Sequence, residues 1–326
     1  MLILTLKEYI NVWQNVEEIK FDDNFNENIK LSNKVKKVKF GRHFNKKIII
    51  PNCVTHLKLG DDFNQKLTIP NSVTNLKLGD DFNQKLIVPN SVTNLTLGHD
   101  FNQKLTIPKN IYYLNWNSCY YLNTKTMRYL NDILELKLSG CYETLDARNL
   151  RNVHILCMNA CDKIINIDCL KNVHSLDLSF SSFLINVNSL NNVHTLILNE
   201  CDNLTNIYGL NNVHSLDLSC SLNITNVDEL KNVHTLKLMG CDSIVDVNIT
   251  KDFYLYDLSE CYNLINVNVS ANVHILDLTW CSELINVNIT GNIHTLKLLY
   301  CDNVNIPKNL ANVHKLMYSR APRDPI

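Results

Sequence analysis

Histidine recurs at a fixed interval in the second half of the chain and is the first candidate for chemistry. Eight of the 11 histidines lie on one 20-residue grid, in which Tyr254 takes the one remaining position; they are His154, His174, His194, His214, His234, His274, His294 and His314. Imidazole ligates metals and titrates near neutral pH, so this column could bind a metal ion or respond to pH. We expect instead a neutral imidazole ladder that bonds the turn backbone, because charged rings about 5 Å apart repel one another. The same repulsion predicts lowered histidine pKa values and a fold that loses stability below about pH 6.5.

Cysteine follows a grid of the same period. Ser181 and Ser221 fill its two gaps, and seven of the 12 cysteines lie on it, namely Cys141, Cys161, Cys201, Cys241, Cys261, Cys281 and Cys301. Neighbouring members are close enough for a metal site or a disulfide ladder. However, side chains of one column point in parallel directions, and no Cys-x-x-Cys pair with zinc-ribbon spacing is present. We therefore predict buried, reduced thiols that cap backbone carbonyls, with no metal and no cofactor. Cys157 is off this grid and faces outward by the pattern, which makes it the expected reactive thiol.

These grids belong to repeats that run along nearly all of the 326 residues. In the first half, Phe-Asn pairs recur every 19 residues, at Phe25, Phe44, Phe63, Phe82 and Phe101. Both halves share a Leu-x-Leu segment, in which alternation directs the two leucines inward and predicts a short strand. Following this segment along the chain gives sixteen turns between Ile19 and Leu316. One turn cannot bury its apolar side alone, so the turns must stack.

Asparagine is the commonest polar residue in these repeats, with 49 copies. Stacking predicts one column of Asn64, Asn83 and Asn102 and a second column of Asn166, Asn186, Asn206, Asn226, Asn266 and Asn286. An amide both donates and accepts, so such columns can bond the turn backbone and one another. Asparagine also tolerates the left-handed backbone conformation, which would explain why eight glycines suffice. An AT-rich genome is the alternative source of this composition, and the sequence favours neither.

The repeat sequences resemble known families. The segment DFNQKLTIPNSV (residues 62–73) resembles the FNIP repeat, a relative of the short leucine-rich repeat that is abundant in social amoebae and in giant viruses of the mimivirus type. The match covers residues 19–113. The segment LDLTWCSEL (residues 276–284) resembles a cysteine-containing leucine-rich repeat. Mimivirus-type FNIP proteins often carry an N-terminal F-box that recruits a ubiquitin ligase, but only eighteen residues precede the first turn here, too few for an F-box.

We therefore predict a β-rich solenoid: a leucine-rich-repeat-like, right-handed arc with one continuous parallel sheet and about sixteen turns of 19–22 residues. Its expected parts are an N-terminal cap (1–18), FNIP-type repeats (19–113), cysteine-containing repeats (114–318) and a tail (319–326). Alternation in return segments such as residues 67–70 predicts a second short extended segment, which proline ends. The longer spacing near residues 124–133 predicts a short helical turn.

Outward strand positions form the candidate partner-binding face. The first repeats place four lysines in one column, Lys20, Lys39, Lys58 and Lys77. The later repeats place acids in the equivalent column, chiefly Asp177, Asp217, Asp257 and Asp277, and aromatic residues beside it, Phe180, Trp280 and Tyr300. A face that begins basic, becomes mixed or acidic and carries aromatic side chains suits a protein partner better than a uniform polymer. The alternative is a solvated face that binds nothing.

Composition and motifs exclude several functions. An apolar fraction of 45% and a net charge of −1 argue against a disordered chain and a nucleic-acid binder. No membrane span, secretory signal, P-loop or G-x-S-x-G motif is present. We therefore predict a monomeric, non-enzymatic protein-interaction scaffold in the host cytoplasm, with neither nucleic acid nor membrane as its partner. The alternatives are a virion-associated structural protein and a substrate-recognition subunit of a ubiquitin ligase that lacks its own F-box.

Overall fold

The computed structural model describes residues 16–117, 122, 130, 132–141, 143–161, 163–182, 184–228, 230, 232–305 and 310–320. Most of the expected N-terminal cap, helical turn and tail lie outside these residues. The predicted fold class is confirmed, because the chain is a β-solenoid whose main sheet has sixteen parallel strands. The structure divides into a first unit, Met1–Met158 with Lys163–Ile165, and a second unit, Asn159–Asp162 with Asn166–Ile326.

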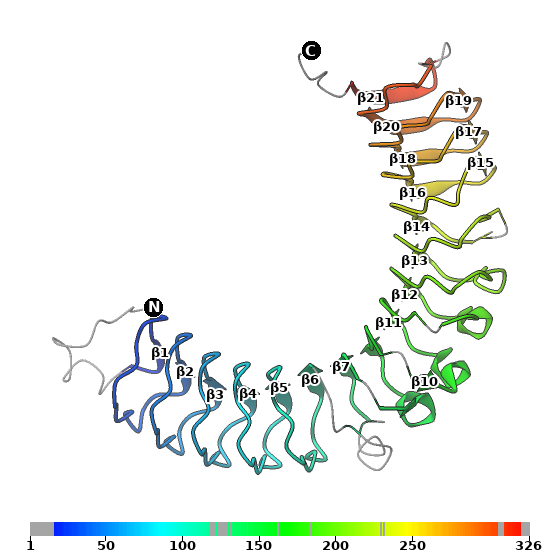
Figure 1. Ribbon diagram of the computed structural model, residues 1–326. Helices are drawn as coiled ribbons and strands as arrows, with labels where there is room; N and C mark the ends of the chain where they lie inside the picture. Colours follow the sequence, from blue (N-terminus) through cyan, green and yellow to red (C-terminus); the bar gives the residue numbers. More distant parts are fainter. Residues whose placement is uncertain are drawn as a thin grey trace. The chain divides into compact units, whose positions relative to one another are not determined.

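The first unit contributes eight strands of the main sheet, and consecutive strands pair in parallel (Figure 1). They are β1 (Glu18–Lys20), β2 (Lys37–Lys39), β3 (His56–Lys58), β4 (Asn75–Lys77), β5 (Asn94–Leu97), β6 (Tyr113–Asn117), β7 (Glu135–Ser139) and β9 (Ile155–Cys157). The register equals the sequence period, since Ile19 pairs with Val38 and Val38 with Leu57. This unit also holds β8 (Leu145–Asp146), β10 (Ile164–Ile165) and the 3-10 helix η2 (Ala147–Leu150).

The second unit contributes the other eight strands: β11 (Ser175–Asp177), β12 (Thr195–Ile197), β13 (Ser215–Asp217), β14 (Thr235–Lys237), β16 (Phe253–Asp257), β18 (Val273–Asp277), β20 (Ile293–Leu299) and β21 (Val313–Ser319). On its return side, β15 (Asp246–Ile249), β17 (Asn266–Val269) and β19 (Asn286–Ile289) form a separate three-stranded parallel sheet. Earlier turns of this unit instead place η3 (Ile167–Leu170) and η4 (Asn188–Leu190) on that side.

The expected second extended segment of the first repeats stays a prediction, because these return residues belong to none of the sheets of the described residues. Residues 67–70 carry no strand, and neither do the equivalent residues of the neighbouring FNIP-type turns. Proline stands at the same place in each of these turns, at Pro51, Pro70, Pro89 and Pro108. Proline has no backbone N–H, so a stack of them cannot continue a hydrogen-bonded ladder. The three-stranded sheet on the return side of the second unit forms where asparagine or aspartate alternates with aliphatic residues, as in β17.

A stack of phenylalanine rings fills the core of the first unit. Consecutive members of the Phe25-to-Phe101 column have ring centroids 5.9, 6.0, 6.1 and 6.2 Å apart and nearly parallel planes. Phe101 ends the column edge-on against Trp116 at 6.1 Å. All of these rings are buried. The Phe-Asn repeat is therefore a continuous aromatic core, in which each turn supplies one ring.

The asparagine beside each phenylalanine forms the expected ladder, which is confirmed. Asn64 Oδ1 accepts from the backbone N–H of Asn83 at 3.0 Å and from Nε2 of Gln84 at 3.0 Å. Asn83 Oδ1 serves Asn102 and Gln103 in the same way, at 3.2 and 2.8 Å. Each amide thus bonds two groups of the next turn, which fixes the register of the stack.

The second asparagine column changes its role along the chain. Asn186, Asn206 and Asn226 each accept a bond from a backbone N–H two residues later, which caps their own turn. Farther on, Asn286 donates to Asn266 at 2.8 Å, and Asn266 donates to Asp246 at 2.6 Å. The asparagine caps its own turn where the three-stranded sheet is absent, and it bonds the side chain of the preceding turn where that sheet is present.

The expectation that asparagine supplies the left-handed backbone is mostly wrong. Among the described residues only Asn166 does so; the others stand at one position of the turn and are of many types, namely Gly140, Ala160, Phe180, Glu200, Cys220, Gly240, Glu260, Trp280 and Tyr300. In the second unit this residue donates its N–H to a carbonyl of the following turn, as Trp280 does to Leu299 at 2.8 Å. Backbone hydrogen bonding therefore sets this conformation, whatever the side chain.

Candidate partner-binding face

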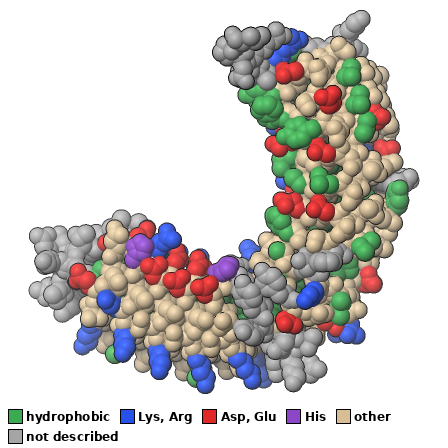
Figure 2. Space-filling view, in the orientation of Figure 1, with side chains coloured by type: hydrophobic (Ala, Val, Ile, Leu, Met, Phe, Trp, Pro, Cys, Tyr) green, Lys and Arg blue, Asp and Glu red, His purple; other side chains and the backbone are tan. Residues whose placement is uncertain are grey.

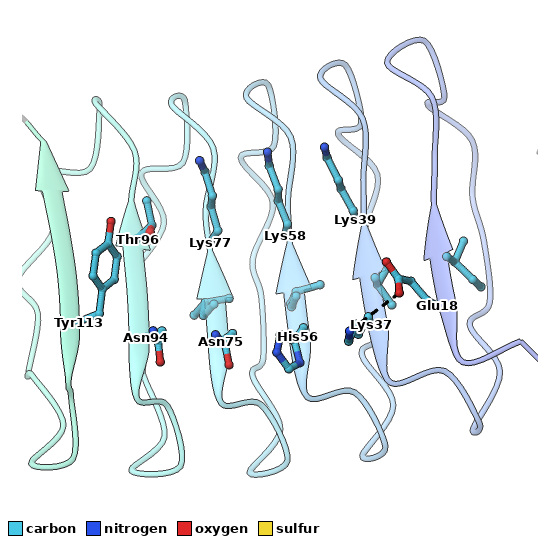
Figure 3. A pocket seen from close by; sticks show the side chains of 14 residues that line it. Glu18, Lys37, Lys39, His56, Lys58, Asn75, Lys77, Asn94, Thr96 and Tyr113 are labelled. Carbon is cyan, nitrogen blue, oxygen red and sulfur yellow. Dashed lines mark ion pairs between the residues drawn. The ribbon is translucent and has the colours of Figure 1, made fainter. Parts of the chain in front are cut away.

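The lysine column lies on the exposed face of the first unit's sheet, in the register that the sequence predicts. Lys20 pairs with Lys39, Lys39 with Lys58 and Lys58 with Lys77 across parallel strands, so neighbouring side chains are about 4.8 Å apart at their bases. Lys39, Lys58 and Lys77 line an open groove of about 400 Å³ that runs across β1 to β6. Figure 3 shows their ammonium groups extending in the same direction, toward the carboxyl ends of the strands.

The four lysines of this column form no ion pair within the described residues. Burial, together with the charges of Lys77 and Lys39, lowers the pKa of Lys58 below its usual value. Asp61 and Asp23 act in the opposite direction and do not reverse the shift. The column is therefore a row of like charges that form no ion pair with the carboxylates of the described residues.

A second column that sequence reasoning missed completes the groove. It consists of the residues two positions before the lysine column and its continuation, Glu18, Lys37, His56, Asn75, Asn94 and Tyr113. Glu18 and Lys37 lie 3.9 Å apart and form an ion pair. These residues follow the same 19-residue period as the lysines, so this column could have been predicted from the sequence.

Acidic residues border the lysines on one side. The turns that follow the strands carry Asp61, Asp62, Asp80, Asp81 and Asp100. Arg42 lies 3.8 Å from Asp61, and His43 lies 2.8 Å from Asp62. Desolvation and the neighbouring carboxylates raise the pKa of Asp81. Figure 2 shows acidic side chains gathered along one edge of this unit. The groove thus has a basic row beside an acidic one.

In the second unit the aspartates of the face already have partners within the protein. Asp277 Oδ1 accepts from the backbone N–H and the hydroxyl of Thr279 at 3.1 and 2.6 Å, and its Oδ2 accepts from Lys297 at 2.7 Å. Asp177, Asp217 and Asp257 bond the serine two residues later in the same way. Lys237 lies 3.3 Å from Asp217. These carboxylates therefore hold the turn together, and two of them also pair with lysines of the next strands.

The aromatic residues of the face stand at the left-handed position of the turn. Phe180, Trp280 and Tyr300 have φ of 60°, 65° and 60°. Trp280 and Tyr300 stack with ring centroids 4.2 Å apart and planes 21° apart, and Trp280 is 44% exposed. A bulky residue with positive φ costs about 1 kcal/mol or more relative to glycine. The second unit thus has this strain at Trp280 and Tyr300, whose stacked rings lie at the surface.

The histidine column is an exposed stack of rings. From His174 to His234 the centroids of consecutive rings lie 4.7, 4.7 and 4.8 Å apart, and the stack continues through Tyr254 to His314. His194 and His294 contact the neighbouring threonine hydroxyls at 3.3 and 3.0 Å, rather than the turn backbone that we expected. Burial and adjacent imidazoles lower the pKa of both rings. No group of three metal-ligating side chains is found among the described residues.

The cysteine column is buried and hydrogen-bonded. Cys241, Cys261, Cys281 and Cys301 donate from Sγ to the carbonyl 23 residues earlier, at 2.9–3.1 Å, and burial raises their pKa values. The expectation of reduced thiols is wrong at Cys141, which is disulfide-bonded. Ten other described cysteines are not disulfide-bonded. Cys157 lies on the exposed face, as predicted, in register with Lys137.

Comparison with known families and structures defines the class. The FNIP Repeat model matches residues 25–62, 44–81, 63–100 and 82–119, so this stretch is similar to FNIP repeats. The solved structure of CroV588, a circular leucine-rich-repeat protein of the giant virus CroV, is 19% identical with a TM-score of 0.50. That match covers 92% of this chain and 52% of CroV588, so the chain spans about half of that protein's length. The likeness shows the leucine-rich-repeat fold.

A second solved structure is similar over much of the chain. The functional domain of InlJ from Listeria monocytogenes, which includes a cysteine ladder, is 12% identical over 88% of this chain and 70% of its own, with a TM-score of 0.48. No curated protein matches the chain. None of the helices in the described part of the chain has both the length and the apolar character needed to span a membrane.

Proposed function

We propose that this protein is a non-enzymatic scaffold that binds a protein partner on the exposed face of its main sheet. The observation that carries the proposal is the row of lysines in the first unit's groove. Like charges directly opposite one another on neighbouring strands are unfavourable, and no carboxylate of the described residues pairs with them. The phenylalanine column, by contrast, packs inside the core, and the cysteine and asparagine columns form hydrogen bonds within the fold.

The polar groups of the second unit support a binding role over a catalytic one. The recurring His-x-x-Asp pairs would be candidates for acid–base chemistry, but in His274 and Asp277 the carboxylate bonds Thr279 and Lys297. A catalytic pair needs the carboxylate to orient the imidazole. Repetition of the pair in several turns is explained by the role of aspartate in closing each turn.

The setting that we propose is intracellular, in the cytoplasm of a host cell, with the protein acting as a monomer. The free thiols among the described residues support a reducing compartment, and the disulfide at Cys141 is the observation against it. Association with a virion, and service as the substrate-recognition subunit of a ubiquitin ligase, are the competing roles. An experiment that captures the partner on a defined face separates them.

A photo-crosslinking residue placed at Thr96 on the sheet face, with Thr68 on the return side as the matched control, tests the proposal in amoebal host lysate. We expect a host protein crosslinked from Thr96 and not from Thr68. Ubiquitin ligase subunits at Thr96 would support the receptor role instead. Crosslinking to a second copy of the chain alone would support a structural role, and equal or absent products at both positions would refute a binding face.

A further inference from the structure

The groove of the first unit has a defined pattern along its length. Lys39, Lys58 and Lys77 occupy three successive strands, Thr96 continues their column on the fourth, and Tyr113 lines the end on the fifth (Figure 3). Three positive side chains are thus followed by a short polar one and then by an aromatic ring. A ligand that lies across the strands meets these groups in this order.

We propose that this groove binds an acidic amphipathic helix of a protein partner, laid across the strands with one stripe of carboxylates on Lys39, Lys58 and Lys77. The proposal rests on the proposed function and names the chemistry of the partner. It is an instance of helix-in-groove recognition, in which regularly spaced side chains of a helix contact one surface.

The spacing of the lysines fits the stripe of a helix. Two strand spacings separate Lys39 from Lys77, which is about 9.6 Å at about 4.8 Å per strand. Residues i and i+7 of a helix are about 10.5 Å apart, with i+3 or i+4 between them on the same face. Alternate residues of an extended peptide would span about 13 Å over three side chains, and would lose register with the lysines. A helix therefore presents one carboxylate to each ammonium.

The acidic row argues against nucleic acid as the occupant. Asp61, Asp80 and Asp81 lie in the turns that border the lysines, and the charge of Asp61 opposes the lowering of the Lys58 pKa. A nucleic-acid backbone has charge on every residue and a broad negative field, so it would meet this row as well as the lysines. A helix can place carboxylates on one stripe only and leave the flank that faces the aspartates neutral or basic.

The aromatic end of the groove extends the motif. Four strand spacings, about 19 Å, separate β2 from β6, which corresponds to about thirteen residues of helix. The partner helix is therefore expected to carry acids at positions 1, 4 and 8, a small residue at position 11 over Thr96, and an apolar residue near position 15 over Tyr113. Tyr113 offers a ring face for that apolar contact, and Lys137 lies 5.8 Å from the ring centroid.

The test uses a synthetic helical peptide with glutamate at positions 1, 4 and 8 and leucine at position 15, titrated against the full chain at low and physiological salt. The control peptide has the same composition, with its glutamates five residues apart and so spread round the helix. The protein variant is K39Q/K58Q/K77Q. Its matched control is K66Q/K85Q/K104Q, which removes three exposed lysines of the same period from the return side.

We expect the striped peptide to bind, the K39Q/K58Q/K77Q variant to lose at least about tenfold in affinity, and the control variant to change less than about twofold. Binding should also raise the Lys58 pKa, because a carboxylate then faces the ammonium. Equal binding of the dispersed peptide, or tighter lysine-dependent binding of a DNA duplex, would overturn the inference. If the striped peptide fails while crosslinking from Thr96 succeeds, the inference is wrong and the proposed function stands. If both fail, the proposed function is wrong too.

Discussion

The cysteine column allows one contribution to stability to be separated from packing. Cys261 is fully buried, and its Sγ donates to the carbonyl of Leu238 at 3.1 Å. We predict that Cys261→Ala destabilises the second unit more than Cys261→Ser does. Both substitutions shrink the side chain, but only the alanine removes the side-chain donor of this carbonyl, which also accepts from the backbone N–H of Cys241 at 3.1 Å.

The magnitude follows from two contributions. The carbonyl of Leu238 keeps the backbone N–H of Cys241 as a donor, so loss of the Sγ bond costs about 0.5–1.5 kcal/mol. Loss of the sulfur leaves a small cavity, which adds about 1 kcal/mol. Cys261→Ala should therefore cost about 1.5–2.5 kcal/mol. Serine keeps a donor, and Ser221 shows that a hydroxyl reaches the equivalent carbonyl, because its Oγ lies 3.0 Å from the oxygen of Leu198. Cys261→Ser should cost about 1 kcal/mol, mainly for the smaller volume.

Two serines of the same column supply an internal control. Ser221 Oγ has its carbonyl partner, whereas Ser181 Oγ is buried without one. Ser221→Ala should destabilise by about 1–3 kcal/mol, and Ser181→Ala should be neutral or slightly stabilising. The substitution is chemically identical at the two positions, so a difference in sign isolates the hydrogen bond.

Urea unfolding and amide hydrogen exchange of the second unit measure these changes. Exchange is needed because a stack of repeats can open locally, with each turn contacting only its neighbours. Equal losses for Cys261→Ala and Cys261→Ser would show that sulfur packing, and not the donor, stabilises the column. Equal effects of alanine at Ser181 and Ser221 would refute the reasoning as a whole.

Three further predictions concern the other columns. The pKa values of His194 and His294 are lowered in the folded state, so the unfolded chain binds more protons than the folded chain below about pH 6.5. The urea concentration at the unfolding midpoint should therefore be lower at about pH 5.5 than at about pH 7.5, and an unchanged midpoint would contradict this. Asn64→Ala removes the acceptor of two bonds and should cost about 1–3 kcal/mol in thermal or urea unfolding, whereas the exposed Asn71→Ala should cost nearly nothing. Glu200 has φ of 53°, so Glu200→Gly should stabilise the protein by about 1 kcal/mol. Glu200→Ala should give no such gain, because alanine has the same difficulty with positive φ. An equal gain with alanine would show that positive φ carries no strain at this position.

Periodicity was enough to predict the strands and their register. A repeat of 19 or 20 residues stacks each residue on its equivalent, so the column of Lys39, Lys58 and Lys77 in the sequence is the column in the sheet. The same argument placed the phenylalanine and asparagine ladders. These features depend only on which residues stack, and a constant period specifies that without any knowledge of the turn.

Features that depend on the backbone within a turn could not be predicted in this way. Positive φ occurs at residues as different as Phe180, Glu200 and Trp280, because a backbone hydrogen bond to the next turn imposes it. The residue type therefore does not predict this conformation. The own-turn bonds of the face aspartates depend on a serine or threonine two residues later. That Asp-x-Ser spacing is visible in the sequence at Asp177, and could have been interpreted as a closed turn.

The two units present different chemistry on equivalent strand positions. In the first unit, the charges of the lysine column have no partner among the described residues and are available to a ligand. In the second, Asp217 and Asp277 bond the hydroxyls of their own turns and the lysines of the next strands, so an external cation would have to replace those bonds. A partner that removes Trp280 and Tyr300 from water would gain affinity without breaking any such bond. Contacts in the second unit are therefore expected to depend on Trp280 and Tyr300 and to be insensitive to salt, whereas those in the first unit weaken as salt rises.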